Sequence, residues 1–67
     1  MKIEDLQDLG TMIKGTRKSQ GITQANLAMA AGTSVRLIVE LEAGTRGVQF
    51  DTVIKVCNLL GLNIDVR

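Results

Sequence analysis

Hydrophobic side chains recur at three- and four-residue spacing in four segments of the chain, which is the period of helices that bury one face. This spacing, together with residues that cap helix starts and Gly residues that end helices, sets the expected limits. The four expected helices run from Ile3 to Gln20, from Gln24 to Ala31, from Val35 to Ala43 and from about Asp51 to Leu60. Most of the chain is therefore predicted to be helical.

The end of the chain follows a different period. Leu62, Ile64 and Val66 alternate with polar residues, which predicts a short, half-buried β-strand over residues 62–66. The pattern offers this strand no partner elsewhere in the chain, and an unpaired strand leaves backbone donors and acceptors exposed. Pairing with a second copy across a two-fold axis would solve this problem. A disordered or merely docked tail is the alternative.

The third expected helix is apolar on more sides than a small protein can bury. Five of the seven residues from Val35 to Leu41 are hydrophobic. If Ile38 and Leu41 point inward, the remaining positions lie on the outer side or on the flanks. These positions are Val35, Arg36, Leu37, Val39, Glu40 and Ala43. The helix is therefore expected to be held by two residues and to expose the others.

Composition favours one small domain, residues 1–67, without catalytic chemistry. The chain has 67 residues, no His and one Cys. A lone Cys cannot form an internal disulfide, and without His the usual partners of a zinc site or a thiol nucleophile are missing. Cys57 is therefore interpreted as a small core residue. We expect no enzyme activity, no cofactor and no metal.

The charge distribution is more informative than the net charge of +1. Three of the seven acids lie in the first eight residues, which resemble neither a signal peptide nor a membrane anchor and favour a cytoplasmic protein. Between positions 9 and 50, five cations face only Glu40 and Glu42. This section could form a phosphate-facing patch or carry ordinary solvated charges.

Several coupled positions resemble the lambda-repressor-like helix-turn-helix family of Cro and Xre type. They are Thr23-Gln24-Ala25-x-Leu27-Ala28, then Ala31-Gly32-Thr33-Ser34, then Ile38-x-x-Leu41-Glu42-x-Gly44. The resemblance covers about residues 9 to 61. It implies a compact domain of four to five helices with the helix-turn-helix over residues 23–43, the second helix of which enters the DNA major groove.

The resemblance also implies roles for individual residues. Arg36 suits a guanine edge or a phosphate, Val35 or Val39 suits a thymine methyl group, and Gln24 resembles a phosphate-binding residue. Arg17 and Glu42 resemble a pair that ties the first helix to the recognition helix. The full set of expected DNA-contacting residues is Thr23, Gln24, Ser34, Val35, Arg36, Val39, Glu40, Thr45 and Arg46.

Two longer stretches, GTRKSQGITQANLAMAAGTSVRLIVELEAG and DTVIKVCNLLGLNIDV, resemble HipB-type antitoxins. These are small helix-turn-helix dimers with a C-terminal strand that repress their own operon beside a HipA-type kinase toxin. The resemblance implies a dimeric repressor, with a palindromic double-stranded operator, a second copy and a HipA-like kinase as partners. The alternative is a protein-interaction module that restrains the kinase, with DNA binding secondary.

Overall fold

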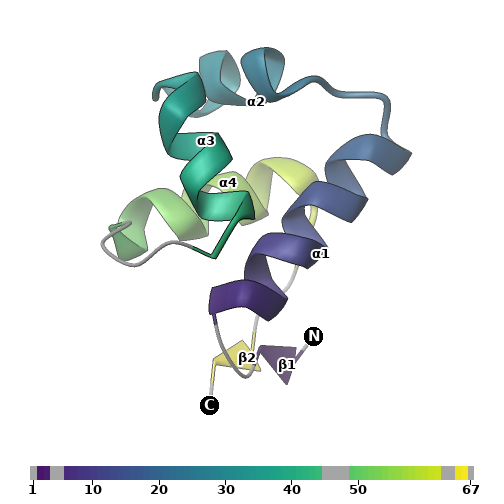
Figure 1. The fold of residues 1–67 in the computed structure, drawn as a ribbon, viewed down its shortest axis with the longest axis vertical. Helices are drawn as coiled ribbons and strands as arrows, with labels where there is room; N and C mark the ends of the chain where they lie inside the picture. The colour runs from purple at the N-terminus through teal and green to yellow at the C-terminus, as the bar shows by residue number, and fades with distance from the viewer. Residues whose placement is uncertain (1, 4–5, 45–48, 63–64, 67) are drawn as a thin grey trace.

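Four helices and two very short strands follow one another in the part of the chain that the computed structural model describes, residues 2–3, 6–44, 49–62 and 65–66. Figure 1 shows α2 and α3 meeting at one end of the fold, with both chain termini at the opposite end. The elements are β1 (Lys2–Ile3), α1 (Leu6–Ser19), α2 (Gln24–Ala31), α3 (Val35–Glu42), α4 (Phe50–Leu60) and β2 (Asp65–Val66).

Capping residues fix the limits of α2 and α3. The Thr23 hydroxyl accepts a hydrogen bond from the backbone N–H of Asn26 at 3.0 Å, and the Ser34 hydroxyl accepts one from Leu37 at 3.1 Å. Between the helices, Gly32 adopts a left-handed conformation with φ of 68°. A residue with a Cβ is strained in this conformation, which is why Gly suits the turn. The predicted limits of α2 are confirmed, and α3 ends at Glu42, with Ala43 as its C-cap.

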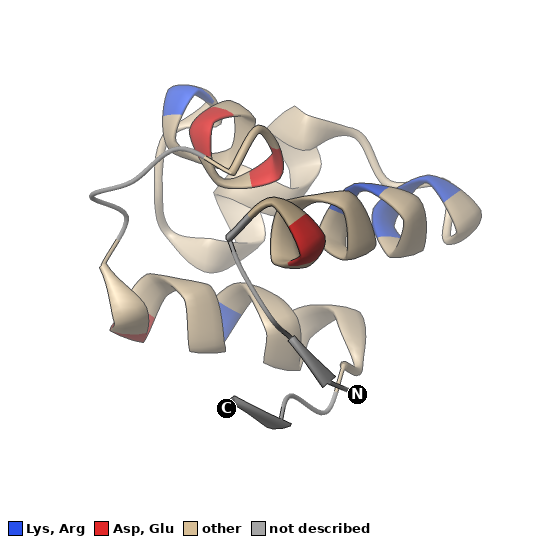
Figure 2. Ribbon diagram, turned by 60° about the horizontal axis from the view of Figure 1, so that its bottom comes forward, with Lys and Arg blue, Asp and Glu red and all other residues tan. Residues whose placement is uncertain are grey.

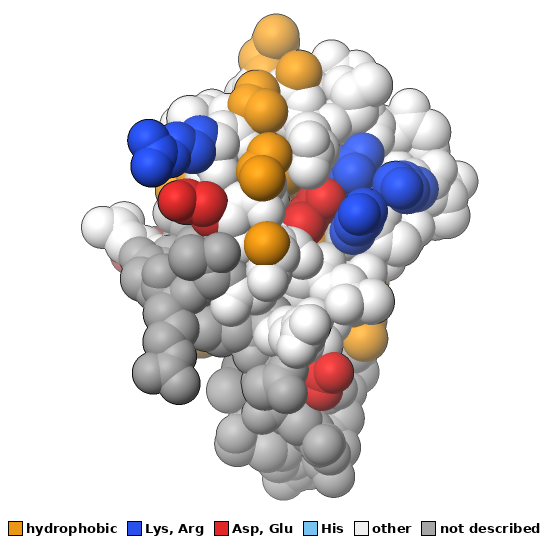
Figure 3. Space-filling view, viewed as in Figure 1, with side chains coloured by type: hydrophobic (Ala, Val, Ile, Leu, Met, Phe, Trp, Pro, Cys, Tyr) orange, Lys and Arg blue, Asp and Glu red, His pale blue; other side chains and the backbone are white. Residues whose placement is uncertain are grey.

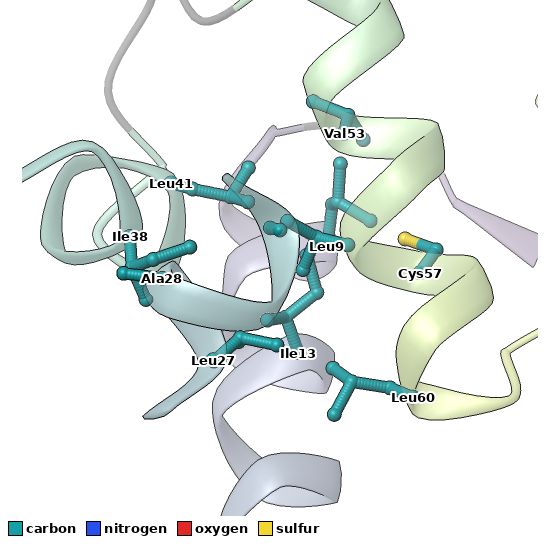
Figure 4. Close-up of a cluster of buried hydrophobic side chains, with 11 residues drawn as sticks. Leu9, Ile13, Leu27, Ala28, Ile38, Leu41, Val53, Cys57 and Leu60 are labelled. Atoms are coloured by element: carbon teal, nitrogen blue, oxygen red, sulfur yellow. The ribbon is translucent and has the colours of Figure 1, made fainter. Parts of the chain in front are cut away.

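All four helices contribute to a single hydrophobic cluster, shown in Figure 4. Ile13, Ile38 and Val56 are each 0 % exposed, so α1, α3 and α4 each contribute a fully buried side chain. The other members are Leu9, Leu27, Ala28, Ala31, Leu41, Val53, Cys57 and Leu60. The cluster consists mainly of aliphatic side chains, and it holds α3 by its inner side alone.

The start of α1 lies against the end of α3 at a distance that only Gly allows. A Cβ added to Gly10 would lie 2.5 Å from the carbonyl oxygen of Glu42 and 2.6 Å from that of Leu41. At the same contact Gly44 has φ of 77°, and its added Cβ would lie 2.9 Å from the Cα of Gln7. The sequence presents Gly10 only as a poor helix former, whereas the structure uses it for a close approach of two backbones.

The last helix is held at its C-terminal end by a contact with the end of α1. The side-chain amide of Gln20 donates to the carbonyl oxygen of Leu60 at 2.9 Å, which satisfies one of the unpaired carbonyls at the end of α4. At the start of α4, Gln49 occupies the N-cap position without a side-chain hydrogen bond. Asp51 lies in the first turn, where an acid complements the helix dipole.

Two expectations about the chain ends are corrected. The first helix begins at Leu6, and Lys2–Ile3 forms β1, which pairs in parallel with β2, Asp65–Val66, of the same chain. The C-terminal strand therefore does have a partner in its own chain. A two-residue strand such as β1 is too short for hydrophobic alternation to reveal.

The structure accordingly supports neither a strand over the whole of residues 62–66 nor its pairing across a dimer. Leu62 is partly buried against the hydrophobic cluster, Ile64 lies outside the described residues, and Val66 belongs to β2.

The contact at Gly10 yields a prediction about stability. Gly10→Ala should destabilise the fold by about 1 to 3 kcal/mol, because the added methyl group forces α1 away from the α3 backbone. Gly15→Ala is the matched control, since an added Cβ at this exposed position of the same helix meets nothing within 4 Å. The control should stabilise by up to about 1 kcal/mol through helix propensity. Urea denaturation followed by circular dichroism measures both, and equal stabilisation by the two substitutions would contradict the close contact.

Candidate nucleic-acid interface

One side of α3 is exposed, from its first turn to its last. Ile38 and Leu41 are 0 % and 2 % exposed, whereas Val35 and Val39 are 44 % and 45 % exposed. Arg36 is also exposed, with 87 % of its side chain accessible, and Leu37 packs at the edge of the hydrophobic cluster. The predicted orientation of this helix is therefore confirmed. We call the side that carries Val35, Arg36, Val39, Glu40 and Ala43 the outer face of α3.

A buried ion pair connects the inner side of α3 to α1. The Nε atom of Arg17 donates to Oε2 of Glu42 at 2.7 Å, and its Nη2 atom donates to Oε1 at 3.2 Å. The guanidinium also donates from Nη1 to the carbonyl oxygen of Ile22 at 2.8 Å. Both residues are buried, 7 % and 9 % exposed. Since a bidentate pair constrains direction as well as distance, it sets the angle of α3 relative to α1.

Gln24 joins this pair from the start of α2. Its side-chain amide nitrogen donates to Oε1 of Glu42 at 3.1 Å, so α1, α2 and α3 meet at one carboxylate. Sequence analysis did not predict this contact, which joins residues 18 positions apart that share no local pattern. An amide nitrogen carries two hydrogens, so this bond leaves the second N–H of Gln24 for another acceptor. Gln24 is half-buried at the first position of α2, near the positive end of the helix dipole.

The remaining candidate residues that the structure describes lie at the starts of α2 and α3 and along α3. Thr23 and Ser34 are exposed N-caps, so their hydroxyls already accept a backbone hydrogen bond. Arg36 and Glu40 form an ion pair along the outer face of α3, with 3.7 Å between Nε and Oε2. The expected contacts of Thr45 and Arg46 lie outside the described residues.

Cationic side chains flank the outer face of α3. Lys14 and Lys18 are exposed on successive turns of α1. Figure 2 shows that the basic positions of α1 lie at a distance from the basic position on α4. In the space-filling view, basic side chains gather over α1 on one side of α3, and a basic and an acidic side chain lie on the other (Figure 3). A stripe of hydrophobic side chains runs between them along α3. This surface combines local positive charge with a helix that is exposed along one side.

The cysteine lies in the core, and the described residues contain no metal-binding cluster. Cys57 is 1 % exposed, and burial raises the pKa of its thiol from 9.0 to about 11, which disfavours the reactive thiolate at neutral pH. Among the described residues, no group of three or more His, Cys, Asp or Glu side chains could hold a metal ion. None of the helices found there combines the length and apolar character needed to cross a membrane.

Two short helices joined by a tight turn, with the second exposed along one side, define a helix-turn-helix protein. The family model for helix-turn-helix proteins matches residues 13–66, so the chain belongs to the Cro/Xre-type helix-turn-helix family.

Two relatives carry names of the same kind. The chain is 38 % identical over 65 residues to an uncharacterized HTH-type transcriptional regulator of Sinorhizobium fredii, covering 97 % of this chain and 86 % of the relative. It is 35 % identical over 63 residues to an uncharacterized HTH-type transcriptional regulator of Haemophilus influenzae, covering 94 % of this chain and 62 % of that relative.

The buried pair yields a double-mutant prediction. Arg17→Met or Glu42→Leu alone should cost about 3 to 5 kcal/mol, because each leaves a buried charge without its partner. The double variant should cost far less than the sum of the two. Urea denaturation of the four proteins measures the coupling.

The matched control is the exposed pair on α3. The same cycle with Arg36→Met and Glu40→Leu should give a coupling below about 1 kcal/mol. Additive effects at Arg17 and Glu42, or equal coupling in the two cycles, would show that the buried pair does not hold α3 to α1.

Proposed function

We propose that this protein is a sequence-specific DNA-binding transcriptional regulator that places the outer face of α3 in the major groove. The observation that carries the proposal is the one-sided anchoring of α3. Ile38, Leu41 and Glu42 hold the helix from within, and the outer face is free from its first turn to its last. Membership of the helix-turn-helix family and the names of the two relatives support the same function.

In this function some polar residues contact the bases and others contact the phosphate backbone. Arg36 suits a guanine edge in the major groove, for which it must exchange its pairing with Glu40 for contacts with the base. Glu40 then either accepts a hydrogen bond from a cytosine amino group or turns away from the DNA. Gln24 suits a backbone phosphate through the amide hydrogen that Glu42 does not occupy. Thr23, Ser34, Thr45 and Arg46 complete the proposed set of DNA contacts.

We further propose that the regulator is a dimeric repressor. A domain of 67 residues presents one recognition helix, which makes few base contacts, whereas a two-fold dimer reads two half-sites on a palindromic operator. The resemblance to HipB-type antitoxins supports a repressor that controls its own operon beside a HipA-like kinase toxin.

The experiment that tests the function begins with selection of duplexes from a random pool by the purified protein. Arg36→Ala should then weaken binding to the selected duplex by about 1 to 3 kcal/mol and relax preference at one base position, because a bidentate base contact is lost. Its stability should stay within about 0.5 kcal/mol of the unmodified protein, since the side chain is exposed. Fluorescence anisotropy at fixed salt measures the affinity.

The control for general charge is Lys55→Ala, which removes an exposed cation from α4. It should leave base preference intact. Failure of the pool to yield a common sequence, or equal affinity and preference in the Arg36→Ala protein, would contradict the proposed use of α3.

The dimer proposal predicts the form of the operator. The selected sequence should be an inverted repeat with half-site centres about 10 base pairs apart, bound by two chains. Sedimentation of the complex gives the stoichiometry, and one chain per operator would contradict the dimer. A chain truncated after Leu62 locates the interface, because a truncated protein that remains dimeric must pair through its helices.

A further inference from the structure

Val35 and Val39 form the centre of an apolar stripe on the outer face of α3. The two side chains are 44 % and 45 % exposed and lie four residues apart, so they sit one above the other on the helix surface. Ala43, four residues further on, is exposed at the end of the stripe. Figure 3 shows hydrophobic side chains running in a line along α3.

Arg36, Glu40 and Glu42, which lie beside this stripe, are paired within the protein. On one side, Arg36 Nε lies 3.7 Å from Glu40 Oε2. On the other side, the Glu42 carboxylate accepts two hydrogen bonds from Arg17 and one from Gln24. The stripe itself can neither donate nor accept a hydrogen bond. A surface that meets base edges through such a stripe therefore needs an apolar feature on the DNA.

In the major groove that feature is the C5-methyl group of thymine. The Cβ atoms of residues four apart on a helix are about 6 Å apart, and successive bases of one strand are about 3.4 Å apart. Two valines at this spacing can contact thymines at adjacent positions or two positions apart. Valine is also stiff about χ1 in a helix, so its methyl groups are held in place before DNA binds.

We propose that Val35 and Val39 are specificity-determining residues that recognise thymine methyl groups within each operator half-site. This proposal rests on the proposed function, because it assigns the base chemistry that the outer face of α3 selects. It implies that one or two positions of the half-site are thymine because of the methyl group, independently of hydrogen bonding.

Single replacement of each thymine in the selected operator by deoxyuridine tests the proposal, since it removes the methyl group and leaves both hydrogen-bonding edges intact. At one or two positions the affinity of the unmodified protein should fall by about fourfold, the value expected for one buried methyl group. Val35→Ala and Val39→Ala should each bind the original operator about fourfold or more weakly. The Val35→Ala protein should bind thymine and deoxyuridine equally well at the base position that Val35 contacts in the unmodified protein. The Val39→Ala protein should do the same at the position that Val39 contacts.

Two control variants make the result specific. Met29→Ala removes a large exposed apolar side chain from α2, 79 % accessible, and should keep the full response to deoxyuridine. Val39→Thr keeps the branched shape but replaces one methyl group with a hydroxyl. Because this removes part of the apolar contact, the loss of affinity on replacing thymine by deoxyuridine should be smaller than in the unmodified protein. Circular dichroism checks that every variant is folded.

The outcomes separate this proposal from the proposed function. Specific binding of the operator with equal affinity for thymine and deoxyuridine would overturn the role of the valines and leave the DNA-binding function standing. A response to deoxyuridine that persists unchanged in both valine variants would assign it to DNA shape and would also overturn the role. Absence of any sequence-specific binding would overturn both.

Discussion

The position of α3 depends on a buried carboxylate that three helices share. An α-helix of eight residues is about 12 Å long and too short to be stable in isolation, so α3 takes its direction from tertiary contacts. Hydrophobic packing through Ile38 and Leu41 holds one side of it but is not directional. The bidentate pairing of Glu42 with Arg17, joined by Gln24, supplies the direction. Such a pair is costly to desolvate, so its main contribution is to orientation.

The position of α3 relative to α1 also depends on a steric constraint, the close approach of their two backbones. Because α1 crosses the end of α3 at Gly10, and Gly44 turns the chain away beside Gln7, the two backbones approach without side chains between them. This close approach brings Arg17 on α1 and Glu42 on α3 within the reach of one ion pair. Loss of either part would let α3 rotate or tilt, and its outer face would then meet a groove at a different angle. The proposed DNA contacts therefore depend on residues that never touch DNA.

Local signals predicted the helices of this fold well. Capping by Thr23 and Ser34, and the left-handed turn at Gly32, can be inferred from residue type, because each depends on neighbours within a few positions. The orientation of α3 followed from the resemblance together with spacing: the family pattern makes Ile38 and Leu41 core residues, and two buried positions on a short helix fix its exposed side. The expected Arg17 and Glu42 contact came from the resemblance to a family rather than from pattern.

Contacts between distant segments could not be predicted in this way. The sequence marks Gly10 as a weak point of α1, and only the structure shows the carbonyl oxygens of α3 beside it. Likewise, the bond from Gln24 to Glu42 and the pairing of Lys2–Ile3 with Asp65–Val66 join segments whose local patterns carry no mutual signal. The expected cross-dimer strand failed for this reason.

We propose that the protein meets DNA through the outer face of α3 and the start of α2. Titration of the ¹⁵N-labelled protein with its selected duplex, followed by backbone amide chemical shifts, tests it residue by residue. We expect the largest changes at Gln24 and from Ser34 to Val39, with small changes along α4. Changes concentrated on α4, with α3 unaffected, would contradict the account.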